Sequence, residues 1–378
     1  MHWATALSTQ SRSAMAIGEV LEQLRADIDQ PDLLLVFVSP HHSSLYEALA
    51  RNLERHHPQA LVLGCSANGV IADHEVEQQP VLGLIAACLP DVGLRPFQLA
   101  ADEPMPDWRE LLQLEPEHEP SFLLFSDPFS GGSDKLLRSL DSSYPAAVKL
   151  GGLVSGGRAP GEHALFLGSQ LSTGGHLGLA LFGDIQIEPV VAQGCRGVGP
   201  AFRVTRCEDR LIHELDGAPA HRVMGQVFTA MQPLERQLFA ASALVGLGMG
   251  EPGREDFLIR HLIGADPEHG LLAVAGQVHE GQALRFHLRD QAASTADLRA
   301  RLGQVEPDAE AALMFTCLGR GEGFYGQPDH DIGLVRERLG DLPVGGFFCN
   351  GELGPVGGRT WLHSYTSALG LVRRRPWS

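Results

Sequence analysis

The chain lacks the features that mark membrane and secreted proteins. No run reaches the roughly 18–20 consecutive apolar residues that a membrane-spanning helix needs. The N-terminal stretch MHWATALSTQSRSAMAIGEVLEQL has no basic segment followed by an apolar one, which a signal peptide would show. We therefore expect a cytoplasmic protein that does not have a membrane as a partner.

Basic residues are also scarce. The chain has 29 Lys and Arg against 46 Asp and Glu, which gives a formal net charge of -17. Such a surface repels phosphate backbones unless basic side chains gather on one face. The clearest basic cluster is Arg373, Arg374 and Arg375 near the C-terminus, which we interpret as a solvated tail. We expect no nucleic acid as a partner.

Motifs for metals and cofactors are missing as well. None of the six cysteines forms a C-x-x-C pair, which argues against a structural zinc site and against a disulfide framework. There is no H-E-x-x-H, no P-loop and no G-x-S-x-G elbow. The stretch GLGMGEPG at 246–253 is similar to a dinucleotide fingerprint, but its third glycine is misplaced. We expect no metal and no cofactor.

Glycine, in contrast, is abundant. The 378 residues include 44 glycines, and 44% of the chain is hydrophobic. The length fits about two domains, and the composition is that of a globular protein. The glycines cluster after apolar strands, where tight turns and close backbone approach are required.

A pattern of strand, helix, strand, glycine turn and strand occurs three times. The first strands end in Phe37, Phe125 and Phe315, and the glycine turns start near Gly64, Gly151 and Gly345. The closing strands are VLGLIAACL, GHLGLALFG and YTSALGLVR. A helix between two strands predicts a crossover connection, and we expect the second and closing strands of each repeat to form a hairpin.

Local signals predict the helix starts and the domain boundary. Ser43 or Ser44 is expected to cap the helix of the first repeat, and Asp331 that of the third. Residues 185–225 and 256–290 alternate between polar and apolar and predict strands. We place the boundary near 225, with domains at 1–225 and 226–378. The predicted fold class is α/β, with pseudo-symmetric mixed sheets built from the repeated units, and with helices outside.

Several stretches together resemble the FIST family, the F-box and intracellular signal transduction proteins. They are GCSANGVI, KLGGLVSGG, GCRGVGPAFRVT, LIHELDGAPA, FTCLGRGEGFYG and GGFFCNGELGPV followed by LHSYTSALGLV. The resemblance covers nearly the whole chain, from ATALST to ALGLV, and implies a FIST N-terminal and a FIST C-terminal domain. It also implies a cytoplasmic sensory module that binds small ligands such as amino acids. With no F-box and no room for a kinase or cyclase, the chain resembles the stand-alone bacterial form, whose signalling partner the sequence does not name.

The third repeat holds the strongest candidate ligand site. Cys317 ends a strand, and Gly319, Arg320 and Gly321 follow it in a glycine-rich loop. Backbone amides of such a loop can cradle an anion, and Arg320 can bind a carboxylate through two hydrogen bonds. The alternative is a simple turn in which Arg320 pairs with a surface acid.

A second group follows the next strand of the same repeat, in GGFFCNGELGP. Glu352 could accept the ammonium group of an amino acid, while Asn350 and Gly351 suit a turn with positive φ. Cys349 precedes this turn, and His363 could hydrogen-bond in the same pocket. A solvated glutamate and a structural histidine are the alternatives.

The other two repeats offer weaker candidates. The first gives Cys65, Ser66 and Asn68, and the second gives Ser155. Because the same turn occurs in three copies, a shared structural role is the first interpretation for these residues. An enzyme that uses Cys317 or Cys349 as a nucleophile is the rival to a sensor, because a thiol beside a base can be activated. A scaffold without any ligand is a third possibility.

Overall fold

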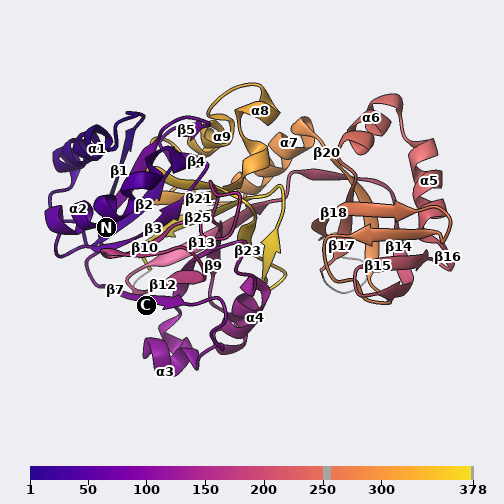
Figure 1. The fold of residues 1–378 in the computed structure, drawn as a ribbon, viewed down its shortest axis with the longest axis horizontal. Coiled ribbons are helices and arrows are strands. Elements are labelled where there is room, and N and C mark those ends of the chain that lie inside the picture. Colours follow the sequence, from indigo (N-terminus) through magenta and orange to yellow (C-terminus); the bar gives the residue numbers. More distant parts are fainter. Residues whose placement is uncertain (250–256, 376–378) are drawn as a thin grey trace. The chain divides into compact units, whose positions relative to one another are not determined.

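The computed structural model describes residues 1–249 and 257–375, and it is a mixed α/β fold with four multi-stranded sheets, as the sequence predicts (Figure 1). The chain divides into two compact units. Unit 1 contains Met1–Val191, Arg299–Leu362 and the segment that begins at Thr366, and unit 2 contains Ala192–Leu298 and His363–Tyr365. The contacts therefore group the third repeat with the first two. The boundary at 225 remains a prediction about the sequence domains.

The three repeats form the centre of unit 1. In each, the first two strands are parallel and joined by a crossover helix, and the closing strand pairs antiparallel with the first strand. The elements are β2 (Leu33–Val38), α2 (Tyr46–His56), β3 (Leu61–Ser66) and β6 (Leu82–Cys88); β8 (Ser121–Ser126), α4 (Ser133–Ser143), β9 (Lys149–Leu153) and β12 (His176–Gly183); and β21 (Ala311–Cys317), α9 (His330–Leu339), β22 (Val344–Cys349) and β25 (Ser367–Arg373).

The expected hairpins are wrong, because the strand after each glycine turn joins a neighbouring sheet. β4 (Gly69–Ala72) leaves the first repeat and pairs with β22 of the third. β23 (Glu352–Val356) leaves the third repeat and pairs with β9 of the second. β10 (Leu165–Leu167) leaves the second repeat and pairs with β3 of the first. This cyclic exchange ties three sheets into one unit, so the pseudo-symmetry is threefold and does not relate two halves.

Shorter elements complete the three sheets of unit 1. The sheet orders are β1-β6-β2-β3-β10-β11, β24-β23-β9-β8-β12-β7 and β13-β25-β21-β22-β4-β5. The additional strands are β1 (His2–Ser8), β5 (Glu75–Glu77), β7 (Val92–Leu99), β11 (Gln170–Ser172), β13 (Gln186–Ala192) and β24 (Arg359–His363). The additional helices are α1 (Ser13–Asp27), α3 (Trp108–Leu112) and α8 (Glu322–Tyr325), with 3-10 turns η1 (Pro40–Leu45), η2 (Pro116–His118) and η3 (Leu318–Arg320).

The continuous apolar strands are explained by burial on both faces. In β2, Leu33, Leu35 and Phe37 face the core between the sheets. The alternate residues Leu34 and Val36 pack under α1 and α2, which lie outside the first sheet (Figure 1).

Four phenylalanines join the three repeats. Phe37, Phe125 and Phe315 occupy equivalent strand ends, and the ring of Phe347 lies 5.0, 5.7 and 5.7 Å from their rings. All four side chains are fully buried. The residue that repeats in the sequence therefore forms the centre of the core.

One glycine in each repeat is required by close strand approach. A Cβ on Gly64, Gly151 or Gly346 would lie 1.9, 1.9 or 1.8 Å from the carbonyl oxygen of the partner residue on the preceding strand. Gly151 and Gly346 also have φ values of 144° and 156°, which side chains disfavour. These three glycines thus have a packing function.

Two expected helix caps are wrong. Ser43 and Ser44 lie inside η1, and Leu45 precedes α2. In the third repeat, Asp329 occupies the N-cap position of α9, and Asp331 lies inside the helix. Asp331 is buried, and its carboxylate is stabilised there by an arginine described below.

Unit 2 contains an antiparallel sheet of seven strands, in the order β14-β20-β17-β18-β19-β15-β16. The alternating segments thus form strands as expected, although the stretch at 246–253 lies partly outside the described residues. The strands are β14 (Cys195–Glu208), β15 (Leu211–Leu215), β16 (Ala218–Pro219), β17 (Leu244–Gly248), β18 (Phe257–Asp266), β19 (Leu271–Val274) and β20 (Ala283–Arg289), with helices α5 (Ala220–Ala230), α6 (Pro233–Ala241) and α7 (Gln291–Leu302).

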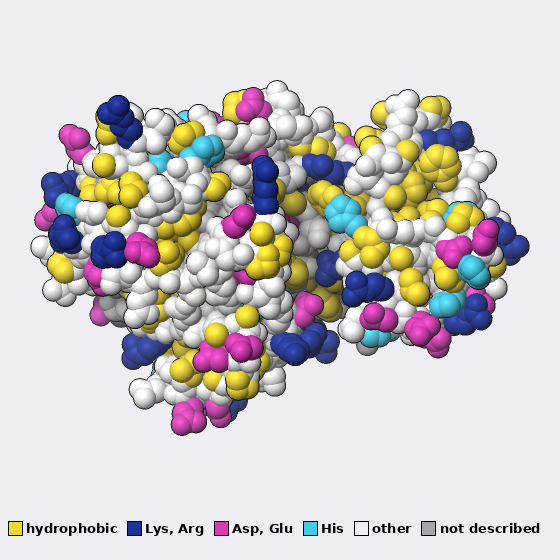
Figure 2. Space-filling model, in the orientation of Figure 1, with side chains coloured by type: hydrophobic (Ala, Val, Ile, Leu, Met, Phe, Trp, Pro, Cys, Tyr) yellow, Lys and Arg dark blue, Asp and Glu magenta, His cyan; other side chains and the backbone are white. Residues whose placement is uncertain are grey.

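The arginines near the C-terminus are not a solvated tail. Arg373 pairs with Glu188, Arg374 with Asp184 and Arg375 with Glu119. On the face that Figure 2 shows, basic side chains are scattered among acidic ones. Among the described residues, none of the helices is both long and apolar enough to cross a bilayer.

Candidate functional site

The three first strands end at equivalent positions that carry different side chains. Val36, Leu124 and Met314 each pair with the close-approach glycine of their repeat. Counting three residues onward from them leads to Ser39, Asp127 and Cys317. The side chain at this position is therefore a hydroxyl in the first repeat, a carboxylate in the second and a thiol in the third.

The loop after Cys317 buries a charged arginine. Arg320 is 1% exposed, and its Nε and Nη2 donate to Asp331 over 2.8 and 3.2 Å. The Tyr325 ring lies 5.8 Å from the guanidinium carbon. Burial alone would lower the pKa of Arg320, but the Asp331 carboxylate raises it. Arg320 is thus a charged group with an internal partner, as the alternative interpretation expects, although that acid is buried.

Glu352 belongs to the same cluster. It is fully buried, its Oε2 accepts the amide of Thr366 over 3.0 Å, and its Oε1 has no hydrogen-bond partner. Burial raises the pKa of Glu352 to about 8. The Thr366 amide, the Arg320 charge and the Cys317 thiol each lower this pKa, but burial has the larger effect. Cys317, Arg320 and Glu352 therefore lie together, and Glu352 is mostly protonated at neutral pH.

Two further acids of β5 complete this region, and the sequence reasoning missed them. Oε1 of Glu75 accepts the amide of Ile332 over 2.8 Å, and Oε1 of Glu77 accepts the amide of Glu322 over 2.9 Å. Burial, and then the Asp331 charge, raise the pKa of Glu75 to about 8. Their signal was the alternation Glu-Val-Glu at 75–77, but only the exchange of β4 and β5 into the third sheet brings them here.

Most other predicted residues of the glycine turns bond to one another. The Ser155 hydroxyl donates to the carbonyl of Phe348 over 2.6 Å and accepts the amide of Asn68 over 2.8 Å. The Ser66 hydroxyl donates to the carbonyl of Ser155, and the Asn350 amide group donates to that of Val154. Neither Asn350 nor Gly351 has the expected positive φ.

The two cysteines of these turns are buried thiols that keep their protons. Cys65 and Cys349 are fully buried, and burial raises the pKa of each thiol well above its usual value.

The glycines of the loop after β21, Gly319 and Gly321, flank Arg320, and a Cβ on Gly321 would collide with the Glu77 carboxylate. Ligand binding by the turn residues stays a prediction.

His363 is buried at the end of β24 and groups with unit 2. The other predicted residues belong to unit 1. Its role in a shared pocket also stays a prediction.

The second repeat holds a buried Asp–His pair that the sequence reasoning missed. Nδ1 of His163 lies 2.7 Å from Oδ1 of Asp127, and Oδ2 accepts the Ser130 hydroxyl over 2.7 Å. The Nε2 of His163 is buried and has no hydrogen-bond partner. The exposed Phe129 ring stacks on the imidazole at 5.5 Å. Alignment of the three strand ends would have pointed to Asp127, but nothing in the sequence pointed to His163.

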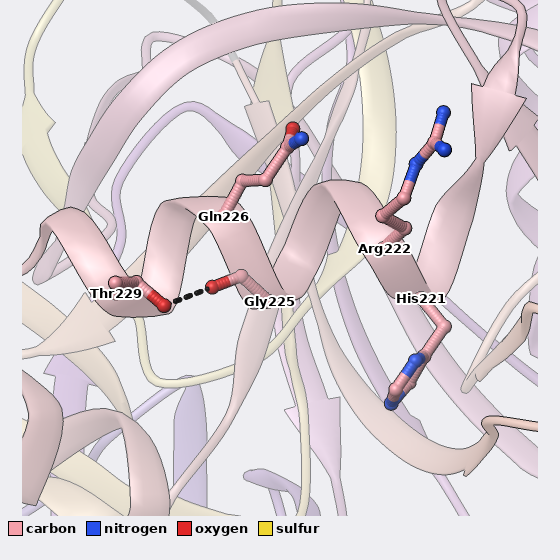
Figure 3. A pocket seen from close by; sticks show the side chains of 5 residues that line it. All are labelled: His221, Arg222, Gly225, Gln226 and Thr229. Carbon is pink, nitrogen blue, oxygen red and sulfur yellow. Dashed lines mark hydrogen bonds between the residues drawn. The ribbon is translucent and has the colours of Figure 1, made fainter.

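A surface hollow on α5 is a weaker candidate for a ligand site. It measures about 630 Å³ and is lined by residues of this one helix, and Figure 3 shows their side chains diverging. The Thr229 hydroxyl is occupied by the carbonyl of Gly225 over 2.8 Å. Since ligand pockets need polar groups that converge, we assign no site here. Among the residues that the structure describes, no group of three or more His, Cys, Asp and Glu is arranged to hold a metal ion.

Comparison with known proteins identifies the family. The model of the FIST N domain matches residues 32–218, and that of the FIST C domain matches residues 220–355. An uncharacterized protein of Mycobacterium tuberculosis is 32% identical over 380 residues, which cover 97% of both chains. One of Mycobacterium bovis is 33% identical over 371 residues, 94% of both chains. An F-box/LRR-repeat protein of Arabidopsis thaliana is 28% identical over 135 residues, 30% of this chain and 26% of that protein.

FIST domains are associated with sensing in signal transduction. The two domain models together match more than three quarters of the sequence, and they follow each other in the order that the resemblance implies. This chain belongs to the FIST family.

Proposed function

We propose that this protein is a cytoplasmic sensor that binds a small ligand, an amino acid or a small carboxylate, beside Cys317, Arg320 and Glu352. The observation that carries the proposal is the Oε1 of Glu352, which is buried without a hydrogen-bond partner. A buried polar atom left unsatisfied costs roughly 1–3 kcal/mol. A ligand that supplies the missing partner recovers this free energy.

The charges of the cluster determine how each ligand class would bind. Arg320 is already paired with Asp331, so a ligand carboxylate has to share the guanidinium with this residue. An ammonium group requires Glu352 to ionise, and its pKa of about 8 opposes this at neutral pH. An amino acid would therefore bind with release of a proton.

The pH dependence of binding separates the two ligand classes. Below pH 8, the affinity for an amino acid should rise about tenfold per pH unit, because the fraction of ionised Glu352 rises by this factor. A small carboxylate that accepts a hydrogen bond from protonated Glu352 should instead bind more weakly as the pH rises. Calorimetric titrations between pH 6 and 8 measure either trend.

The test of the function is a thermal-shift screen of the full chain. The probes are the common amino acids and small carboxylates such as acetate and succinate. A probe at 100 times its Kd adds about 2.7 kcal/mol to the stability of the native state. Glu352→Gln should abolish the shift, whereas the control Glu75→Gln, which also removes a buried acid of raised pKa, should keep it. Equal shifts in both variants, or none from any probe, would contradict the proposal.

The rival function is catalysis by a cysteine. The proximity of Cys317 to Glu352, whose ionised form could accept the thiol proton, favours it. The raised pKa of Cys349 disfavours that residue as a nucleophile. Labelling with iodoacetamide at pH 8, where about half of Glu352 is ionised, separates the two functions, since an activated Cys317 would react much faster than the other cysteines.

A further inference from the structure

Two cysteines of the third repeat lie side by side. Cys317 is the last residue of β21, and Cys349 is the last residue of β22. They are partners in the register of these parallel strands. Neighbouring strands are about 4.8 Å apart, which falls within the Cα separation of about 4.4–6.8 Å that a disulfide spans.

Their side chains point to the same face of the sheet. Side chains alternate along a strand, so Cys317 shares its face with Phe315, and Cys349 shares its face with Phe347. The rings of Phe315 and Phe347 are 5.7 Å apart in the core between the sheets. Cys349 belongs to the same core. The two thiols therefore lie on the same face of the sheet, as a disulfide between them requires.

The surroundings give the two thiols different roles. Cys317 is partly exposed, whereas Cys349 is fully buried. The Cys317 sulfur accepts the amide of Gly319 over 3.4 Å, and the carboxyl of Glu352 is its neighbour. A small oxidant can reach Cys317, and Cys349 can then react with it inside the protein.

We propose that Cys317 and Cys349 form a reversible disulfide when the protein meets a peroxide. This inference does not rest on the proposed ligand. None of the six cysteines is joined in a disulfide in the structure. Cys317 is partly exposed, and exposed disulfides are the readily reduced, regulatory ones.

The chemistry balances with one peroxide molecule. In the fraction of molecules whose Glu352 is ionised, the Cys317 thiol gives its proton to this carboxylate, and the thiolate attacks one peroxide oxygen. The O–O bond breaks, which leaves a sulfenic acid on Cys317 and, once the other oxygen takes up the proton, one water from hydrogen peroxide. The Cys349 sulfur attacks the sulfenic sulfur, an S–S bond forms, and the hydroxyl group leaves with the Cys349 proton as a second water. Two thiols are oxidised, and the peroxide is reduced.

Cys65 is the rival partner. It is buried in the same core, and its charge would contribute to the raised pKa of Cys349. The strand register favours Cys317, because Cys65 lies on β3 of a different sheet. The experiment therefore has to distinguish these two pairings.

Peptide mapping of the full chain tests the proposal. The protein is treated with hydrogen peroxide, alkylated and digested with trypsin, which can cut after Arg320, Arg336 and Arg338 and so separates the two cysteines. We expect a Cys317–Cys349 linked peptide that disappears on treatment with dithiothreitol. The matched variant Cys65→Ser should give the same link in the same yield.

Two further variants check the order of events. In Cys349→Ser, Cys317 should remain a sulfenic acid that dimedone traps. In Glu352→Gln, oxidation of Cys317 should be several-fold slower than in the wild type, an effect that a purely structural Glu352 would not produce. A Cys65–Cys349 link would overturn the proposal. So would full alkylation of Cys317 and Cys349 after a peroxide dose that oxidises added glutathione completely.

Discussion

The strand ends of the second and third repeats share a backbone but differ in how they satisfy buried charge. In the second, Asp127 has both carboxylate oxygens occupied by His163 and Ser130. In the third, Arg320 satisfies Asp331, whereas Glu352 keeps one oxygen without a hydrogen-bond partner. The atom without a partner is therefore a carboxyl oxygen in the third repeat and an imidazole nitrogen, Nε2 of His163, in the second. Because a carboxyl oxygen beside a charged arginine suits an amino acid or a small carboxylate, we place the ligand in the third repeat.

The largest effect should come from the glycines that the repeats share. Gly151→Ala and Gly346→Ala place a Cβ less than 2 Å from a carbonyl oxygen of the adjacent strand. We expect each to lower the free energy of unfolding by about 5 kcal/mol or more, enough to prevent folding of a marginally stable protein. Urea denaturation measures this.

The matched control is Gly18→Ala, in the interior of α1, where a Cβ would meet nothing within 4 Å. It should stabilise the protein by up to about 1 kcal/mol. If Gly151→Ala were as stable as Gly18→Ala, the close approach of the strands would be dispensable.

The next effect concerns the third repeat alone. Arg320→Gln removes the arginine partner of the buried Asp331, which keeps its bond to His330, and we expect a loss of about 3 kcal/mol in the free energy of unfolding. The double variant Arg320→Met, Asp331→Leu removes both charges and should recover most of that loss. A double variant as unstable as Arg320→Gln would show that packing, and not the unpaired charge, causes the effect.

The corresponding change in the second repeat should cost less. Asp127→Asn keeps the shape of the side chain but weakens its bonds to His163 and Ser130. We expect a loss of about 1–3 kcal/mol, measured by urea denaturation. The exposed Asp341→Asn should change stability by less than about 0.5 kcal/mol. A larger loss for Asp127→Asn than for Arg320→Gln would reverse the comparison between the two clusters.

The last prediction is a pH dependence of the free energy of unfolding, which changes only gradually from one pH value to the next. In the folded state the pKa of Glu352 and of Glu75 is about 8, against 4.5 for an ordinary glutamate. Their contribution to stability is therefore fully present below pH 4.5 and is lost as the pH rises toward 8. Each acid lowers the free energy of unfolding by up to about 1.4 kcal/mol per pH unit in this interval.

Chemical denaturation at several pH values tests this dependence. Glu352→Gln and Glu75→Gln should each flatten the decline in stability between pH 5 and 8. The same measurement on Asp127→Asn provides the comparison with the second repeat. Unchanged slopes in both Glu variants would mean that these acids are ionised in the folded protein.

The sequence by itself determined the repeated unit. The apolar strands, the helices between them and the glycine turns follow from local periodicity and from the special conformations of glycine. The apolar run of β2 can only be buried on both faces, so a covered, parallel pair of strands was predictable. The proximity of Cys317 and Arg320 also follows from their spacing along the chain.

Only the tertiary structure decided which strands join across repeats. A hairpin and an exchanged strand have the same local pattern, because β4 would satisfy its backbone hydrogen bonds equally well on β3 or on β22. This choice brings Glu75 to Ile332 of α9, 257 residues away in the sequence, and His163 to Asp127, 36 residues away. Burial of these groups, and with it the raised pKa of Glu352, depends on side chains from several repeats, which no local pattern encodes.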